Sequence, residues 1–223
     1  MDFTRYLSNS YVVFSEAELP RNRACVLINF HLTRTEIPVV KTYKGVIHHF
    51  NDAPDDVKDY FPNFVELVEN YPWDVSVSYF FSRIEQAKHM VIYCGIVKLH
   101  WCESTLTRTM VDKEHMSRGR FKELYKTVFG KNIKSEIIIK LENGEKARDK
   151  IAHGKNWTEK EVREGLVSAI DFASEFNDFV QEDAGFRPFG SLKGFKGRAE
   201  SLPKSTTRWV LQGMGIPKQS ANK

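Results

Sequence analysis

Apolar residues recur three and four positions apart along four segments of the chain, the spacing that places side chains on one face of an α-helix. Within the third segment, Asn143 and Gly144 form a pair typical of turns, which predicts a kink in that helix. Four amphipathic helices with short connections predict a mainly α fold, arranged as an antiparallel four-helix bundle. The four segments are residues 77–94, 121–129, 137–151 and 162–180.

Proline and capping residues mark the limits of this bundle. Proline in a helix interior removes a hydrogen bond and clashes with the preceding turn, and no proline occurs between Trp73 and Arg187. Thr158 and Glu161 have the spacing of a capping box, which predicts the start of the fourth helix. We therefore expect an N-terminal extension, a helical bundle and a basic C-terminal tail that contains Gly, Ser and Pro. Their bounds are residues 1–72, 73–185 and 186–223.

The N-terminal extension has a weaker pattern. Residues 25–32 and 38–50 mix β-branched and aromatic side chains without a settled period, so helix and hairpin both remain open there. Residues 63–70 have the pattern of a short helix. The extension is therefore expected to be α or mixed α/β.

The composition is that of an ordinary globular chain. Of its 223 residues, 41% are hydrophobic and 28% are charged, which excludes wholesale disorder and low-complexity classes. No stretch approaches the roughly 20 apolar residues of a membrane span, and the first residues lack the basic head and apolar run of a signal peptide. The three cysteines form no C-x-x-C pattern. We expect free thiols, a cytoplasmic location and no membrane partner.

Charge sets the C-terminal tail apart. The chain has a formal net charge of +4, yet residues 186–223 hold eight basic side chains and one acidic one. Basic groups interleaved with aromatic rings suit phosphate contacts and base stacking, which favours RNA binding. A tail that only increases solubility is one alternative, and a tail that binds DNA or a membrane surface is another. The candidate RNA-binding residues here are Arg187, Lys193, Lys196 and Arg198.

Several common chemistries lack their motifs in this chain. The phosphate-binding patterns G-x-x-x-x-G-K-[ST] and G-x-G-x-x-G are absent, as is the G-x-S-x-G elbow of serine hydrolases. The histidines and cysteines are scattered without the spacing of zinc ligands. We therefore expect neither a cofactor nor a metal site.

The segment RDKIAHG, from Arg148 to Gly154, is the strongest candidate for chemistry. Arg148 projects from the apolar stripe of its helix, so its guanidinium needs a carboxylate, a helix end, another subunit or a bound anion. Asp149 and His153 are four residues apart and are expected to face each other across one helical turn. Histidine changes charge near neutral pH, which makes His153 a candidate for proton transfer.

A structural interpretation of the same segment remains open. In it, His153 simply ends the helix before Gly154, and Arg148 joins two helices through a salt bridge. Arg148 and His153 also lie about 140° apart on one helix, too far round to grip one phosphate easily. A second copy of the chain could complete such a site.

Two other segments have a similar spacing of arginine and histidine. Arg83 precedes His89, which is expected to project away from the apolar stripe into solvent. Arg108 precedes His115 in a polar stretch that lacks an apolar framework. We interpret both as chance matches.

RDKIAHG followed by a capped amphipathic helix resembles the signature of the HEPN superfamily (higher eukaryotes and prokaryotes nucleotide-binding domain). In that signature an arginine and a polar residue precede a histidine, before the last helix of a four-helix bundle. The resemblance covers about residues 73–185. It implies a metal-independent endoribonuclease of toxin or antiviral-defence type, or a non-catalytic relative that binds RNA or nucleotides. Many active members are dimers.

The resemblance also implies a role for each residue of the segment. The ribose 2′-hydroxyl of RNA would attack the adjacent phosphorus, with His153 as general base or acid and Arg148 stabilising charge on the phosphoryl oxygens. Asp149 would orient the imidazole, while Lys150 and Lys155 would hold backbone phosphates. The expected partners are RNA, a second copy of the chain, and an antitoxin or regulatory protein.

Overall fold

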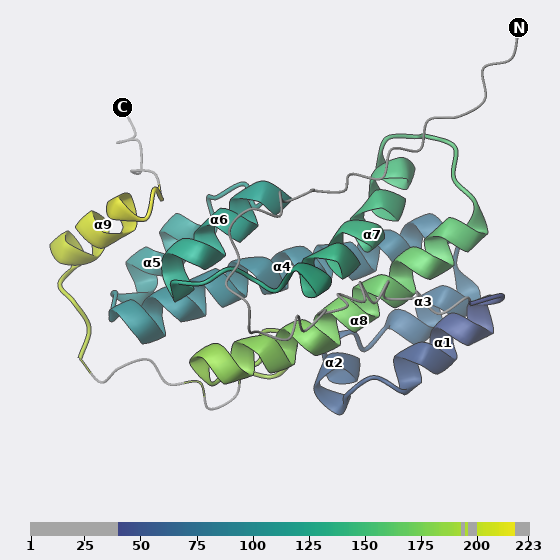
Figure 1. Cartoon of the computed structure of the whole chain (residues 1–223), viewed down its shortest axis with the longest axis horizontal. Helices are drawn as coiled ribbons and strands as arrows, with labels where there is room; N and C mark the ends of the chain where they lie inside the picture. The colour runs from purple at the N-terminus through teal and green to yellow at the C-terminus, as the bar shows by residue number, and fades with distance from the viewer. Residues whose placement is uncertain (1–39, 193–194, 196–199, 217–223) are drawn as a thin grey trace, which may run out of the picture. The chain divides into compact units, whose positions relative to one another are not determined.

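The computed structural model describes residues 40–192, 195 and 200–216, and all regular secondary structure in this part of the chain is helical (Figure 1). The mainly α prediction is confirmed. None of the described helices is both long enough and apolar enough to cross a membrane. The four helices expected from the periodicity are α4 (Trp73–His100), α6 (Arg118–Phe129), α7 (Ser135–Ala152) and α8 (Glu159–Ala184). The shorter helices are α1 (Tyr43–Asn51), α2 (Asp55–Tyr60), α3 (Phe64–Asn70), α5 (Ser104–Val111) and α9 (Lys204–Gly213).

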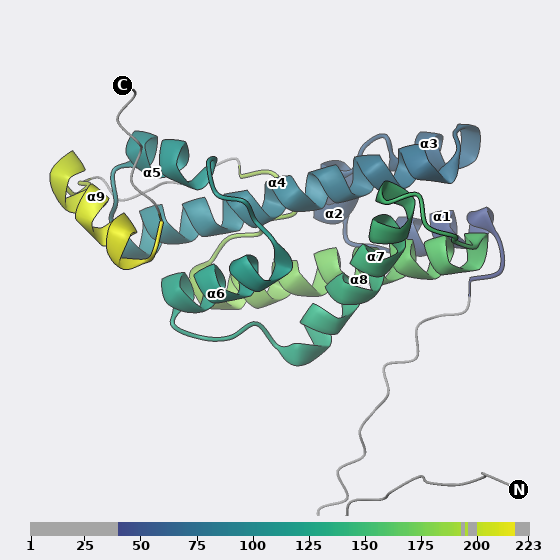
Figure 2. The same ribbon diagram turned by 90° about the horizontal axis from the view of Figure 1, so that it is seen from above.

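The contacts at the helix ends define the direction of each helix. Near the C-terminal end of α4, Gly95 packs against Val128 and Phe129 at the end of α6. One turn further on, the Lys98 ammonium donates a hydrogen bond of 3.2 Å to the carbonyl oxygen of Gly185, just beyond α8. The C-terminal ends of α4, α6 and α8 therefore lie at the same end of the bundle, and the three helices run in the same direction. This is possible because α5 and its flanking segments return the chain between α4 and α6. Helix α7 runs against them and lies antiparallel beside α8 (Figures 1 and 2).

Helices α7 and α8 approach each other closely at two glycines. Helix α7 is continuous through Asn143 and Gly144, so the predicted kink was wrong. A Cβ atom on Gly144 would lie 3.0 Å from the carbonyl oxygen of Gly165, and one on Gly165 would lie 2.7 Å from the Cβ atom of Ala147. Packing against α8 thus outweighs the turn preference of the pair, and the glycine serves close approach instead.

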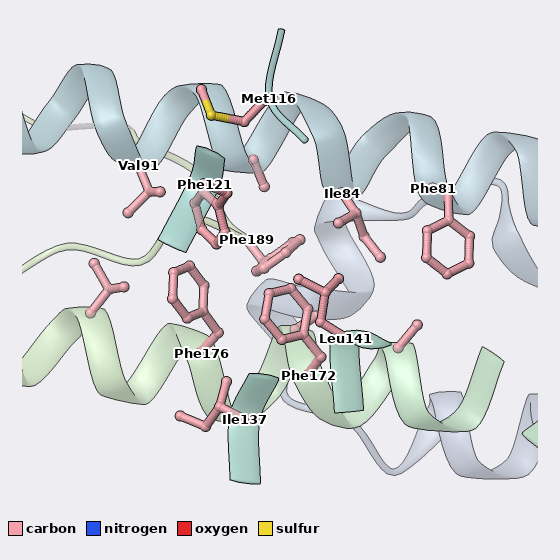
Figure 3. Packing of buried hydrophobic residues seen from close by; sticks show 14 of the residues in the cluster. Phe81, Ile84, Val91, Met116, Phe121, Ile137, Leu141, Phe172, Phe176 and Phe189 are labelled. Carbon is pink, nitrogen blue, oxygen red and sulfur yellow. The ribbon is translucent and has the colours of Figure 1, made fainter. Parts of the chain in front are cut away.

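The core lies where α4 and α8 face each other. Figure 3 shows Phe81 and Ile84 of α4 pointing toward Phe172 and Phe176 of α8, and all four side chains are buried. Leu141 of α7 joins them from a third side. The apolar stripes expected from the sequence are therefore the faces that form the core.

The described part of the N-terminal extension is helical and belongs to the same core. Residues 43–50 lie in α1, and the short helix expected at residues 63–70 is α3. Residues 25–32, for which helix and hairpin were both open, lie outside the described part. The buried residues that α1, α2, α3 and their connections contribute are Val46, Phe50, Ala53, Val57, Phe61, Phe64 and Val68.

The C-terminal segment also contributes to the packing. Phe186 and Phe189 are buried directly after α8, and Phe189 contacts the rings of Phe172 and Phe176. Further along, α9 packs on α5 and buries Leu211. Part of the predicted basic tail is therefore folded against the bundle.

Candidate functional site

Helix α7 ends in a hydrogen-bonded C-cap at the RDKIAHG segment. Gly154 has a left-handed backbone conformation (φ +61°), and its N–H donates to the carbonyl oxygen of Ile151. The N–H of Lys155 donates to the carbonyl oxygen of Lys150 at 2.8 Å. These two bonds form a Schellman motif, which satisfies the last carbonyls of the helix. His153 is the C-cap residue, and its side chain is exposed.

Arg148 lies on the face of α7 that points toward α4. Its guanidinium carbon is 5.8 Å from the centroid of the Phe81 ring, and 34% of its side chain is exposed. Its Nε atom lies 3.1 Å from Oδ1 of Asp149, yet this buried atom makes no hydrogen bond within the described residues. The expected anionic partner of Arg148 is therefore the neighbouring carboxylate, at a distance and angle that leave the Nε–H unsatisfied.

The expected contact between Asp149 and His153 does not form. Among the described residues, neither an ion pair nor a hydrogen bond joins the two side chains, and Asp149 pairs with Arg148 instead. The expectation assumed a regular turn with both side chains directed along the helix axis. The regular helix ends before His153, which is the C-cap residue, and the Asp149 carboxylate lies against the Arg148 guanidinium.

A groove of about 440 Å³ runs between α7 and α8 beside the end of α7. We call it the α7–α8 groove. It contains Asp149, Lys150 and Lys155, three of the residues singled out from the sequence, whereas Arg148 and His153 are not part of its lining. The groove is lined by Asn143, Lys146, Ala147, Asp149, Lys150, Lys155, Glu161, Glu164 and Gly165.

Charges in the α7–α8 groove are only partly neutralised. The Lys150 ammonium forms an ion pair of 2.5 Å with Glu161, which also closes the capping box of α8 with Thr158. The hydrogen bond from Lys150, followed by the one from the Thr158 backbone, lowers the pKa of Glu161. Lys146 and Lys155 are exposed, and within the described part of the chain neither has a carboxylate within 4.0 Å. These two ammonium groups are thus available to an anionic ligand.

The structure contains a buried charge cluster that the sequence analysis missed. The Lys88 ammonium, 1% exposed, lies 2.9 Å from Oε1 of Glu145, whose other carboxylate oxygen accepts a hydrogen bond from Arg118. Burial alone would raise the pKa of Glu145, but the attraction of Lys88 and Arg118 outweighs it and lowers that pKa. Lys88 lies four residues after Ile84 and three before Val91, so its position on the apolar stripe was the available signal.

The basic residues predicted beyond α8 are largely outside this site. Arg187 forms ion pairs of 2.8 Å with Asp56 and Asp178, and the hydrogen bond with Asp56 raises the pKa of its guanidinium. Its charge is already engaged in joining α8 to α2. Three further candidates lie outside the described residues; they are Lys193, Lys196 and Arg198.

The end of α7 therefore combines an exposed imidazole, a partly exposed arginine and a groove in which Lys146 and Lys155 have no carboxylate within 4.0 Å among the described residues. Comparisons with known protein families, curated proteins and solved structures found no match to this chain.

Proposed function

We propose that this protein cleaves RNA without a metal ion, as the resemblance of RDKIAHG to the HEPN signature implies. The observation that carries the proposal is the exposed His153 beside a groove whose Lys146 and Lys155 lack acidic partners in the described region. An imidazole transfers protons near neutral pH, and unneutralised lysines attract backbone phosphates. Together they suit a phosphodiester substrate.

The reaction begins at the ribose 2′-hydroxyl. Its oxygen forms a bond to the adjacent phosphorus while the bond from phosphorus to the 5′-oxygen breaks. His153 either accepts the 2′-hydroxyl proton as a general base or supplies a proton to the departing 5′-oxygen as a general acid, and water exchanges the other proton. The products are a 2′,3′-cyclic phosphate and a free 5′-hydroxyl.

Arg148 stabilises the charge that develops on the phosphoryl oxygens. Its planar guanidinium can donate two parallel hydrogen bonds to a phosphate, and its side chain is partly exposed. Asp149 holds the guanidinium in place before RNA binds, which replaces the imidazole-orienting role first assigned to it. Lys150 and Lys155, with Lys146, hold the flanking phosphates in the α7–α8 groove.

The complete site uses two copies of the chain. Arg148 lies over Phe81 of α4, whereas His153 is the exposed C-cap residue of α7, and no contact joins the two side chains among the described residues. A homodimer that brings Arg148 of one copy to His153 of the other supplies both groups. A cytoplasmic toxin or antiviral-defence role, controlled by an antitoxin or regulatory protein, is the setting that the resemblance implies.

The proposal is tested by incubating the purified protein with RNA in EDTA and identifying the product ends. We expect cleavage that leaves cyclic phosphate and 5′-hydroxyl ends, with His153→Ala reducing the rate by about 10²-fold or more. His115→Ala is the matched control, since it removes another exposed histidine that follows an arginine at a similar spacing. Intact RNA with the wild-type protein, or equal rates for the two variants, would contradict the proposal.

A second candidate is a non-catalytic HEPN-like module that binds RNA or nucleotides. The ion pair between Arg148 and Asp149 and the position of the guanidinium over Phe81 favour it, because both contacts give Arg148 a structural role. This module would bind RNA through Lys146 and Lys155 and leave it intact. RNA binding that survives His153→Ala, with no cleavage by the wild type, identifies it.

A further inference from the structure

A second hollow lies beside α4, which contributes Arg83, Gln86 and Met90 to its lining. It has a volume of about 810 Å³ and is formed by α4, α5 and the segment after α8. We call it the α4–α5 hollow. Its lining includes the basic Arg83 and Arg108, the acidic Glu85 and Asp112, and the apolar Pro188 and Leu192, which we call its apolar side. The two arginines come from the segments that the sequence analysis set aside as chance matches.

Arg83 presents a fixed positive charge to this hollow. Its Nε and Nη2 atoms donate hydrogen bonds of 3.1 and 2.8 Å to the carbonyl oxygen of Tyr60, the last residue of α2. Its Nη1 atom donates a bond of 2.8 Å to Oε1 of Gln86, and its guanidinium carbon lies 4.1 Å from the Tyr60 ring centroid. These contacts fix the guanidinium but use only neutral partners. No carboxylate of the described residues lies within 4.0 Å of it.

Arg108 supplies a second guanidinium from α5. Its Nε atom donates to Oδ2 of Asp112 at 2.9 Å, so this side of the group is paired. Its Nη1 atom lies 3.7 Å from the sulfur of Met90, a weak acceptor, and 46% of the side chain is exposed. The terminal nitrogens of Arg108 therefore keep donor capacity for a ligand in the hollow.

The other charged and titratable groups of the lining already have partners. The Glu85 carboxylate lies 2.9 Å from the Lys88 ammonium, and Asp112 is paired with Arg108. His89 was expected in solvent, but its two ring nitrogens lie 2.9 and 3.1 Å from backbone carbonyl oxygens of Glu85 and Glu114. Lys88 shares its charge between Glu85 and Glu145, and among the cations that line the hollow Arg83 is the one without a carboxylate within 4.0 Å in the described part of the chain.

We propose that the α4–α5 hollow binds the phosphate group of a small phosphorylated molecule. Two guanidiniums from different helices approach one space, and the fork of Arg83 is already held in one orientation, which reduces the entropy lost on binding. The volume lies within the range of small-ligand pockets, and Pro188 and Leu192 offer an apolar surface to the rest of the ligand. This site is independent of the proposed RNA cleavage at α7.

The direct test is Gln86→Glu, studied by calorimetric titration of the full chain with AMP and with inorganic pyrophosphate. The new carboxylate keeps the hydrogen bond from Arg83 and supplies the acidic partner that Arg83 lacks. We expect saturable binding of both probes to the wild type and an affinity at least about tenfold lower in Gln86→Glu. The melting temperature should be unchanged or higher, because the contact between Arg83 and residue 86 gains an ion pair.

Gln181→Glu is the matched control, since it places the same charge change at an exposed position of α8, and it should bind both probes as the wild type does. If AMP binds more tightly than pyrophosphate, the apolar side of the hollow contacts the nucleoside. If the two probes bind equally, the hollow recognises only the phosphates. Absence of saturable binding to the wild type, or equal affinity in Gln86→Glu, would overturn the proposal. Neither result depends on whether the protein cleaves RNA.

Discussion

At the scale of single residues, Glu145 is a buried carboxylate whose charge is compensated by two cationic side chains. Its carboxylate is 3% exposed and is held between Lys88 of α4 and Arg118 of α6. Removing one member of a buried ion pair leaves the other charge uncompensated, which typically costs about 3–5 kcal/mol. The cluster joins three helices through charge rather than through apolar contact.

This arrangement makes the stability of the protein depend on pH. The pKa of Glu145 is lower in the folded chain than its ordinary value of about 4.3. Between these two values the unfolded chain binds more protons, so the free energy of unfolding falls as the pH drops below about 4.3. We expect urea unfolding at pH 7 and pH 3.5 to show a smaller loss of stability for Glu145→Gln than for the wild type.

Glu136→Gln provides the control for this prediction, because it removes an exposed carboxylate near the start of the same helix. Its pH dependence should match that of the wild type. If Glu145→Gln and the wild type lost the same stability between the two pH values, the paired carboxylate would not be the group responsible.

The scale of the single residue is also where sequence patterns were least informative. The periodicity identified the face of α4 that carries Ile84 and Val91, but it could not show that Lys88 on that face would meet a carboxylate from α7. The expected contact of Asp149 with His153 was wrong for a related reason. Charge pairs depend on side-chain directions and on neighbours from other helices, which spacing along one helix does not specify.

At the scale of elements, local signals predicted α3, α4, α6, α7 and α8, left α1 open between helix and hairpin, and did not predict α2, α5 or α9. The capping box at Thr158 begins α8, and the left-handed Gly130 ends α6 after its apolar stripe. The kink predicted at Asn143 and Gly144 was wrong, because a turn preference of one pair competes with the packing of a whole helix on its neighbour. The antiparallel arrangement expected of the four helices holds for α7 against α8 but not for α4, α6 and α8, which run in the same direction because α5 returns the chain before α6.

Gly165 lies where α7 and α8 approach each other closely. Gly165→Ala would place a Cβ atom 2.7 Å from that of Ala147, so the helices must separate. We expect a loss of about 1–3 kcal/mol in the free energy of unfolding, measured by urea denaturation.

Gly119→Ala is the matched control, because Gly119 lies in α6 with no atom within 4 Å of its added Cβ. That substitution should increase the free energy of unfolding by up to about 1 kcal/mol, since alanine favours the helix more than glycine does. Equal stability of Gly165→Ala and the wild type would show that the close approach is not required.

At the scale of the whole molecule, the helices form two hollows on different parts of the bundle, each lined by both basic and acidic side chains. The α7–α8 groove carries Lys146 and Lys155 beside His153, and the α4–α5 hollow carries Arg83 and Arg108. The sequence identified the first region through RDKIAHG but missed Lys146 in it. It discounted the arginines of the second, because their convergence requires α4 and α5 to fold against each other.

The RNA cleavage that we propose takes Arg148 and His153 from two copies of the chain, since no contact joins these two side chains among the described residues of one protomer. In a symmetric dimer, each site would take Arg148 from one protomer and His153 from the other. A protomer with Arg148→Ala and a partner with His153→Ala would then still form one intact site between them.

The most direct test is the RNA cleavage rate of an equimolar mixture of the Arg148→Ala and His153→Ala proteins after their protomers have exchanged. Half of the dimers would be mixed, each with one intact site of two, so we predict recovery of about one quarter of the wild-type rate. Each variant alone should be nearly inactive. A mixture no more active than the separate variants, with the wild type active and exchange confirmed, would contradict a site shared between two copies.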